Sequence, residues 1–163
     1  MNASDVMITD VTTVKPNTKV QEVAEILVTK RISGMPVVDD SGKVVGMISE
    51  GDLLRRSAEG AWPRAWGSPP RRGWVRLLMD GDNLDTEYVT QPDRRVADIM
   101  TYDIISAEPE TSVSDIATLL VHHRIKRVPI IRNGKLVGLV SRANLIEALA
   151  GVRQKDKDDH VRA

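Results

Sequence analysis

Two short stretches of the chain, residues 46–52 and 138–144, share a spacing of residues that could bind a polar ligand. Each has a glycine, a serine three positions later, and then Asp52 in the first stretch or Asn144 in the second. A serine at a helix N-terminus lies beside exposed backbone N–H groups that suit oxygen anions. An aspartate can accept hydrogen bonds from two neighbouring hydroxyls. This spacing therefore indicates binding of a ligand that is rich in hydroxyls and carries negative charge.

Catalysis and metal binding are not indicated by the remaining polar residues. No serine elbow, phosphate-loop lysine motif or dinucleotide glycine motif is present. His122 and His123 are adjacent, so on a helix they point about 100° apart and do not form a two-ligand metal clamp. The acids are too scattered in the expected fold to form an acid–base pair: Glu50, Asp52, Asp103 and Asp115.

The composition is typical of a protein outside the membrane in a reducing compartment. Among 163 residues there are 23 basic and 23 acidic side chains, so bulk attraction to DNA or anionic lipid is not expected. The chain has no cysteine, no apolar run of ~20 residues, and no basic and apolar leader at its N-terminus. These features predict a cytoplasmic location.

One segment departs from this balance. Residues 55–76 carry six arginines and one glutamate, interleaved with Trp62, Trp66 and Trp74. Such a segment could neutralise and stack on nucleic acid, but it more often folds back onto its own module. Nucleic-acid binding is therefore not the favoured interpretation.

The chain contains an internal duplication. Residues 6–54 align with residues 99–146, first at an offset of 93 and then, after one residue is lost in a turn, at an offset of 92. Glycine, proline and apolar positions agree along the alignment. A unit of about fifty residues buries too little surface to be stable alone, so the two copies are expected to pack on each other.

Both copies predict the same elements: a strand or loop, a helix, two strands and a closing helix. The first helix is expected at Val20–Lys30 with Thr18 as its cap, and its counterpart at about Val113–His123 with Thr111 or Ser112 as cap. Strand pairs are expected at Met35–Val38 with Lys43–Ile48 and at Val128–Ile131 with Lys135–Val140, and closing helices at Glu50–Arg56 and Arg142–Leu149. An Asn-Gly pair predicts a tight turn in the second hairpin.

These strings resemble CBS (cystathionine β-synthase-type) domains. The resemblance lies in the two stretches at 46–52 and 138–144, the Pro-Val-Val and Pro-Ile-Ile strands before them, and the opening Met100–Ile104. It is of the bacterial type with a Trp- and Arg-rich linker. It implies an α/β (α+β) fold in which two β-α-β-β-α repeats pack with pseudo-two-fold symmetry as a Bateman-type module. The implied segments are repeat 1 at 6–57, a linker insert at 58–95, repeat 2 at 96–150 and a flexible tail at 151–163.

The resemblance also implies two clefts, each joining parts of both repeats. The main cleft would be formed by Thr101, Ile105, Ser106, Ile125, Lys126, Arg127, Val128 and Pro129 together with Ser49 and Asp52. A second cleft, weaker or empty, would be formed by Thr13, Ile32, Ser33, Gly34, Met35 and Pro36 together with Ser141 and Asn144. In the second cleft Ile8 replaces Thr101, and Asn144 replaces the ribose-binding aspartate.

The implied function is a non-catalytic, ligand-sensing regulatory module that binds an adenine nucleotide. AMP, ADP, ATP, NAD and S-adenosylmethionine all remain open. AMP is favoured because Lys126 and Arg127 suit a short phosphate tail. A homodimer and a regulated target protein are implied as partners, with no metal and no membrane. The alternative is a ligand-free structural module for homodimerisation, which Asp52→Ala would distinguish by its lack of effect.

Overall fold

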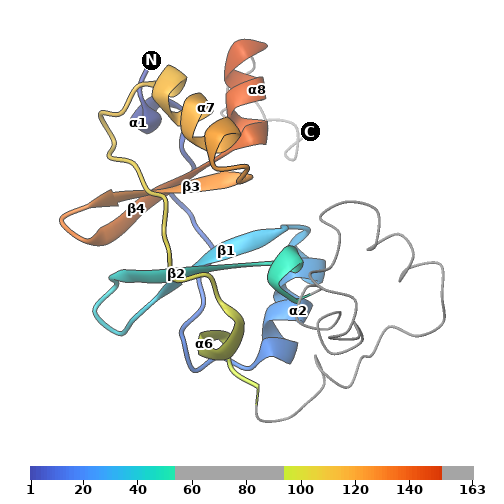
Figure 1. Cartoon of the computed structure of the whole chain (residues 1–163). Helices are drawn as coiled ribbons and strands as arrows, with labels where there is room; N and C mark the ends of the chain where they lie inside the picture. Colours follow the sequence, from blue (N-terminus) through green and yellow to red (C-terminus); the bar gives the residue numbers. More distant parts are fainter. Residues whose placement is uncertain (54–93, 152–163) are drawn as a thin grey trace, which may run out of the picture. The chain divides into compact units, whose positions relative to one another are not determined.

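The computed structural model describes residues 1–53 and 94–151, which divide into two units (Figure 1). The Asp52 unit contains Thr13–Ser41 and the described residues of Val45–Ile104. The Asn144 unit contains Met1–Thr12, Gly42–Val44 and the described chain from Ile105 onward. The predicted linker insert lies outside the described residues except for residues 94 and 95, and so does the predicted tail after residue 151.

The Asp52 unit is a two-stranded sheet with helices on one side. Strand β1 (Gly34–Val38) pairs with β2 (Val44–Ser49), and α2 (Val20–Lys30) and the short α6 (Val96–Ile99) lie on the same side of this sheet (Figure 1). Burial alternates along β2, as expected for a strand with one face on a core. The core is aliphatic: Val14, Val20, Val23, Leu27, Met35, Val37, Ile48, Leu53, Val96, Ile99 and Met100.

The Asn144 unit repeats this plan. Strand β3 (Arg127–Arg132) pairs antiparallel with β4 (Lys135–Ser141), and α7 (Val113–His122) and α8 (Arg142–Leu149) contact this hairpin and each other (Figure 1). The short α1 (Ala3–Val6) contacts α7, α8 and β4. A second core forms here: Ala3, Ala107, Ile116, Leu120, Val128, Ile130, Val140 and Leu145.

The two short helices were not expected from the sequence, and each one packs with the other repeat. In the Asp52 unit, the Val96 N–H donates to the Thr18 carbonyl at 2.9 Å. In the Asn144 unit, the Ala3 N–H donates to the Thr111 carbonyl at 2.8 Å. These pairs are equivalent under the offset of 93, so the same docking occurs twice. The chain therefore exchanges the opening segments of its repeats between the two units.

The mixed helix–strand fold and most predicted elements are confirmed. Residues 50–53 are helical, as expected for the start of the first closing helix. The Asn-Gly turn is confirmed by positive φ values of 52° at Asn133 and 77° at Gly134. Ser112 caps α7 by accepting a hydrogen bond from the Asp115 N–H at 3.1 Å.

The predicted cap of α2 is wrong. Lys19 is the N-cap residue of α2, and its side chain makes no capping hydrogen bond. The Thr18 hydroxyl instead accepts from the Lys15 N–H at 3.1 Å, because it closes the turn before the helix. Thr111 does the same with the Glu108 N–H at 3.0 Å.

Candidate functional site

The Asp52 carboxylate lies at the junction between β2 and the helical residues 50–53. It is 6% exposed and is held by both of its oxygens. Oδ2 accepts from the Ser49 N–H at 2.9 Å and from the Ser49 hydroxyl at 3.1 Å. Oδ1 accepts from the Thr101 hydroxyl at 3.2 Å. Three of the predicted site residues therefore meet in one unit.

Thr101 reaches Asp52 because the segment after α6 runs beside β2. The backbones of Met47 and Thr101 exchange two hydrogen bonds, at 2.8 and 3.0 Å. A Cβ added to Gly46 would lie 2.7 Å from the Met100 sulfur and 3.1 Å from the Thr101 carbonyl oxygen. The glycine at the start of the repeated stretch thus permits the close approach that delivers the Thr101 hydroxyl.

A mostly apolar pocket lies next to this junction in the Asp52 unit. Its volume is about 620 Å³, and it lies between α2 and the helical residues 50–53. The Ser33 carbonyl accepts from the Glu50 N–H at 2.9 Å, which connects the segment before Pro36 to the start of that helix. The described lining residues are Ala24, Leu27, Val28, Arg31, Ile32, Ser33, Glu50 and Leu53.

The Asn144 turn has the same backbone arrangement with different polar groups. Asn144 is 8% exposed, and its Oδ1 accepts from both the N–H and the hydroxyl of Ser141 at 2.8 Å. Ile8 pairs with Leu139 through two backbone hydrogen bonds of 3.0 Å, in the position that Thr101 has beside Met47. Ile8 has no hydroxyl, so the hydrogen bond that Thr101 makes to Asp52 has no counterpart from this position.

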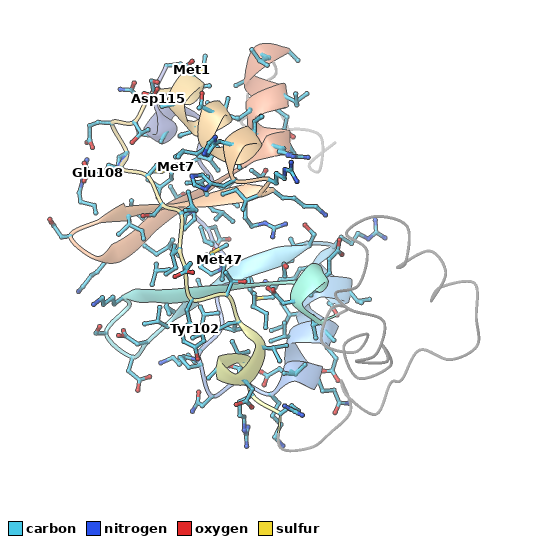
Figure 2. The ribbon with its side chains drawn as sticks, viewed as in Figure 1. Met1, Met7, Met47, Tyr102, Glu108 and Asp115 are labelled. Atoms are coloured by element: carbon cyan, nitrogen blue, oxygen red, sulfur yellow. The ribbon has the colours of Figure 1, made fainter. Side chains whose placement is uncertain are left out.

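The close approach is also repeated in the Asn144 unit. A Cβ on Gly138 would overlap the side chain of Met7, which lies in the same unit (Figure 2). The two glycines of the repeated stretch therefore have the same structural role, and the polar residues that follow them carry the difference between the turns.

The two cations predicted to bind phosphate lie beside Ser141 in the Asn144 unit. The Lys126 carbonyl accepts from the Arg142 N–H at 3.0 Å. Arg127 is the direct partner of Ser141 in the β3–β4 ladder. Neither the Lys126–Arg142 hydrogen bond nor the Ser33–Glu50 hydrogen bond was predicted from the sequence. The two hydrogen bonds join equivalent positions of the two repeats, so the same contact occurs in both units.

The members of each predicted cleft are divided between the two units. Of the main cleft, Ser49, Asp52 and Thr101 belong to the Asp52 unit. The others belong to the Asn144 unit: Ile105, Ser106, Ile125, Lys126, Arg127, Val128 and Pro129. Of the second cleft, Ser141 and Asn144 belong to the Asn144 unit, and Thr13 and residues 32–36 to the Asp52 unit. The grouping of these residues into two clefts stays a prediction.

No group of three or more metal-ligating side chains occurs among residues 1–53 and 94–151. In the same part of the chain, no helix is long and apolar enough to cross a membrane.

Comparison with known proteins identifies the family. The CBS domain model matches residues 3–59 and 96–151, more than half of the chain, so this chain belongs to the CBS-domain family. It is 30% identical over 154 residues to the CBS domain-containing protein CBSX1 of Arabidopsis thaliana, covering 89% of this chain and 61% of that protein. It is 28% identical to the CBS domain-containing protein YhcV of Bacillus subtilis, covering 88% of this chain and 82% of YhcV.

Solved structures show the same fold. The crystal structure of CBSX2 in complex with AMP matches with a TM-score of 0.69 and 27% identity, over 93% of this chain and 97% of that one. The CBS domain pair of protein MJ0100 matches with a TM-score of 0.65 at 21% identity, over 94% of this chain and 98% of that one. The chain spans only 61% of the length of the Arabidopsis proteins CBSX1 and CBSX2.

Proposed function

We propose that this chain is a non-catalytic, cytoplasmic regulatory module that binds an adenine nucleotide and places its ribose on Asp52. The observation that carries the proposal is the buried Asp52 carboxylate, whose Oδ1 already accepts a hydrogen bond from the Thr101 hydroxyl at 3.2 Å. A ribose hydroxyl would bind at Oδ1 beside or in place of the Thr101 hydroxyl. The relative CBSX2, which has been solved in complex with AMP, supports an adenine ligand.

The remaining parts of the nucleotide would contact residues predicted from the sequence. AMP is the favoured ligand, and ADP, ATP, NAD and S-adenosylmethionine are the other candidates. Lys126 and Arg127 would neutralise the phosphate, since both are cationic and a guanidinium pairs well with phosphate oxygens. Apolar residues would accept the base: Ile105, Ile125, Val128 and Pro129. Binding would stabilise one conformation of the module, and that preference would signal to a regulated target protein.

A thermal-shift panel of these five ligands tests the proposal on wild type, Asp52→Ala and Thr101→Val. A ligand at about a hundredfold its dissociation constant stabilises the fold by ~2.7 kcal/mol, which raises Tm by roughly 5–10 °C for a chain of this size. We expect AMP to produce this shift in wild type, Asp52→Ala to abolish it and Thr101→Val to reduce it.

The matched control is Asp10→Ala, which removes an exposed carboxylate from the other unit and should retain the full shift. The unliganded Tm of each variant separates a lost site from a lost fold. If no adenine ligand shifts wild type after any copurified nucleotide has been removed, the chain is a structural module instead.

We further propose a homodimer formed through exposed helix faces. Val28 on α2 and Val121 on α7 are equivalent under the offset of 93, and they are 78% and 73% exposed. Ile146 and Leu149 on α8 are also exposed apolar residues. Sedimentation velocity should show a dimer for wild type and a monomer for Val121→Glu, and a monomeric wild type would rule the dimer out.

A further inference from the structure

The pocket beside α2 has buried apolar side chains at its base and polar side chains around them. It lies between α2 and the helical residues 50–53 and has a volume of about 620 Å³ (Figure 1). Leu27 and Leu53 line it and are only 7% and 6% exposed, whereas Val28 at its edge is 78% exposed. The polar lining residues are Arg31, Ser33 and Glu50. A pocket of this size and character suits a large apolar group with a polar atom.

The chain leaves and re-enters the described residues beside opposite halves of α2. Leu53 lines the pocket next to the C-terminal half of this helix, and residues 54–93 follow it. The chain returns at Arg94, whose carbonyl accepts from the N–H of Val20, the first residue of α2, at 3.0 Å. The 11 residues of α2 are about 16 Å long, which about five extended residues would span. Residues 54–93 are therefore far longer than a connection needs to be, and both of their ends are fixed beside α2.

The apolar residues of this segment match the pocket. All three tryptophans of the chain lie in it, at Trp62, Trp66 and Trp74. A tryptophan buries about 150–250 Å² of surface and has one N–H that needs an acceptor when it is buried. The Ser33 hydroxyl and the Glu50 carboxylate are acceptors at the pocket. Both residues already interact with other groups, but a carboxylate has about four lone-pair sites and can accept one more hydrogen bond.

The charges of the segment and of the pocket are complementary. Residues 61–76 contain four arginines and no acid. The pocket is lined by Glu50 and Arg31, and Glu25 lies one helical turn before Val28, so two acids and one base stand here. The equivalent positions of the Asn144 unit carry no acid and three bases: Arg124, Lys126 and Arg142. An arginine-rich segment is therefore attracted to this surface of the Asp52 unit and repelled by its counterpart.

We infer that residues 61–76 fold back onto α2 and bury at least one of the three tryptophans in this pocket, with their arginines beside Glu25 and Glu50. The inference concerns the Asp52 unit alone and does not depend on nucleotide binding. Val28 borders the pocket and also belongs to the proposed dimer surface. The oligomeric state of each variant is therefore measured together with the docking of the segment.

Tryptophan fluorescence of the full chain tests this inference, because the signal comes only from residues 62, 66 and 74. We expect wild-type emission at a shorter wavelength than that of free tryptophan, with restricted quenching by acrylamide. Ala24→Lys places a long cationic side chain in the pocket, so it should move the emission to longer wavelength and increase the quenching. Ala117→Lys is the matched control, since Ala117 is the equivalent half-buried residue of α7, and it should leave the emission unchanged.

A fluorescent label tests the place of docking directly, because the chain has no cysteine. Bimane attached to Val28→Cys should be quenched by a tryptophan in contact with it. Bimane on Val121→Cys, the equivalent exposed position of α7, should stay bright. The variants Trp62→Phe, Trp66→Phe and Trp74→Phe are compared singly, and the one that restores bimane emission identifies the docked side chain.

The inference is overturned if wild type fluoresces like free tryptophan, if Ala24→Lys and Ala117→Lys give the same emission, or if bimane is equally bright at both positions. Sedimentation velocity over a dilution series identifies the other occupant. If the short-wavelength emission is lost as a dimer dissociates, the pocket is covered by a second copy of the chain and the inference is wrong. Circular dichroism confirms that each variant is folded, and Val28→Lys at the exposed edge replaces Ala24→Lys if that variant is not.

Discussion

The Asp52 turn and the Asn144 turn share a backbone and differ in the charge that they present. In both, a strand ends at a serine whose N–H and hydroxyl bind the side chain three residues later, at 2.8–3.1 Å. In the Asp52 turn the second carboxylate oxygen faces the hydroxyl of Thr101. In the Asn144 turn the equivalent atom is an amide nitrogen, and Ile8 stands in the threonine position.

This difference shows how a duplicated module can diversify. Both turns contain the glycine, the serine and a side-chain acceptor for the serine. The serine and the acceptor close the turn, and the glycine leaves space for the segment of the other repeat that packs against it. Aspartate and asparagine both meet these requirements, so the outward-facing atom can change without loss of the turn. One repeat can then present a carboxylate oxygen at this position while the other presents an amide nitrogen.

The largest expected effect tests whether the two units are equally dependent on their cores. Ile48 and Ile130 are fully buried, one in each core cluster. Replacing either one by alanine should destabilise the protein by about 2–5 kcal/mol, from lost transfer energy and the remaining cavity. Urea denaturation followed by circular dichroism measures the free energy of unfolding. A large effect for one variant and less than about 0.5 kcal/mol for the other would break the equivalence of the units.

The next effect concerns the close approach at Gly46. Gly46→Ala should cost about 1–3 kcal/mol, because its Cβ overlaps Met100 and crowds the Thr101 carbonyl. Gly51→Ala is the matched control, since its Cβ would meet only the Ser49 hydroxyl oxygen at 3.5 Å and the residue is helical. The control should be neutral or stabilising by up to about 1 kcal/mol. Equal free energies of unfolding for the two variants in urea would contradict the close approach of Met100 and Thr101 to Gly46.

The smallest effect compares the first turns of α2 and α7. Ser112 caps α7, so Ser112→Ala should destabilise the protein by about 1 kcal/mol. Lys19 occupies the same position before α2 in an extended conformation without a capping bond. Lys19→Ser should therefore stabilise the protein by a few tenths to about 1 kcal/mol. Thermal unfolding of both variants checks the signs, and a loss of stability in Lys19→Ser would show that Lys19 makes a contribution that serine cannot replace.

Most of the local structure could be predicted from the sequence, because it depends on neighbouring residues. The periodicity of apolar residues placed α2, α7 and α8 within about one residue of their observed ends, and the Asn-Gly pair predicted its hairpin. The short helices α1 and α6 were missed because four residues carry too little periodicity to be recognised. One sequence feature does mark these two helices. Asp5 and Asp98 stand at equivalent positions, 93 residues apart, and each accepts a hydrogen bond from the backbone N–H three residues earlier, at the start of its helix.

The sequence by itself determined the duplication, the family resemblance and the residue types of both turns, because these follow from the order of residues along the chain. The resemblance also implied that Thr101 lies beside the Ser49–Asp52 turn. Only the tertiary structure decided the contacts themselves: the backbone of Thr101 pairs with that of Met47, and the Lys126 carbonyl accepts from the Arg142 N–H. These pairings join residues that are far apart in sequence. They depend on backbone hydrogen bonds and on the space that a glycine leaves, and neither can be seen in a local pattern.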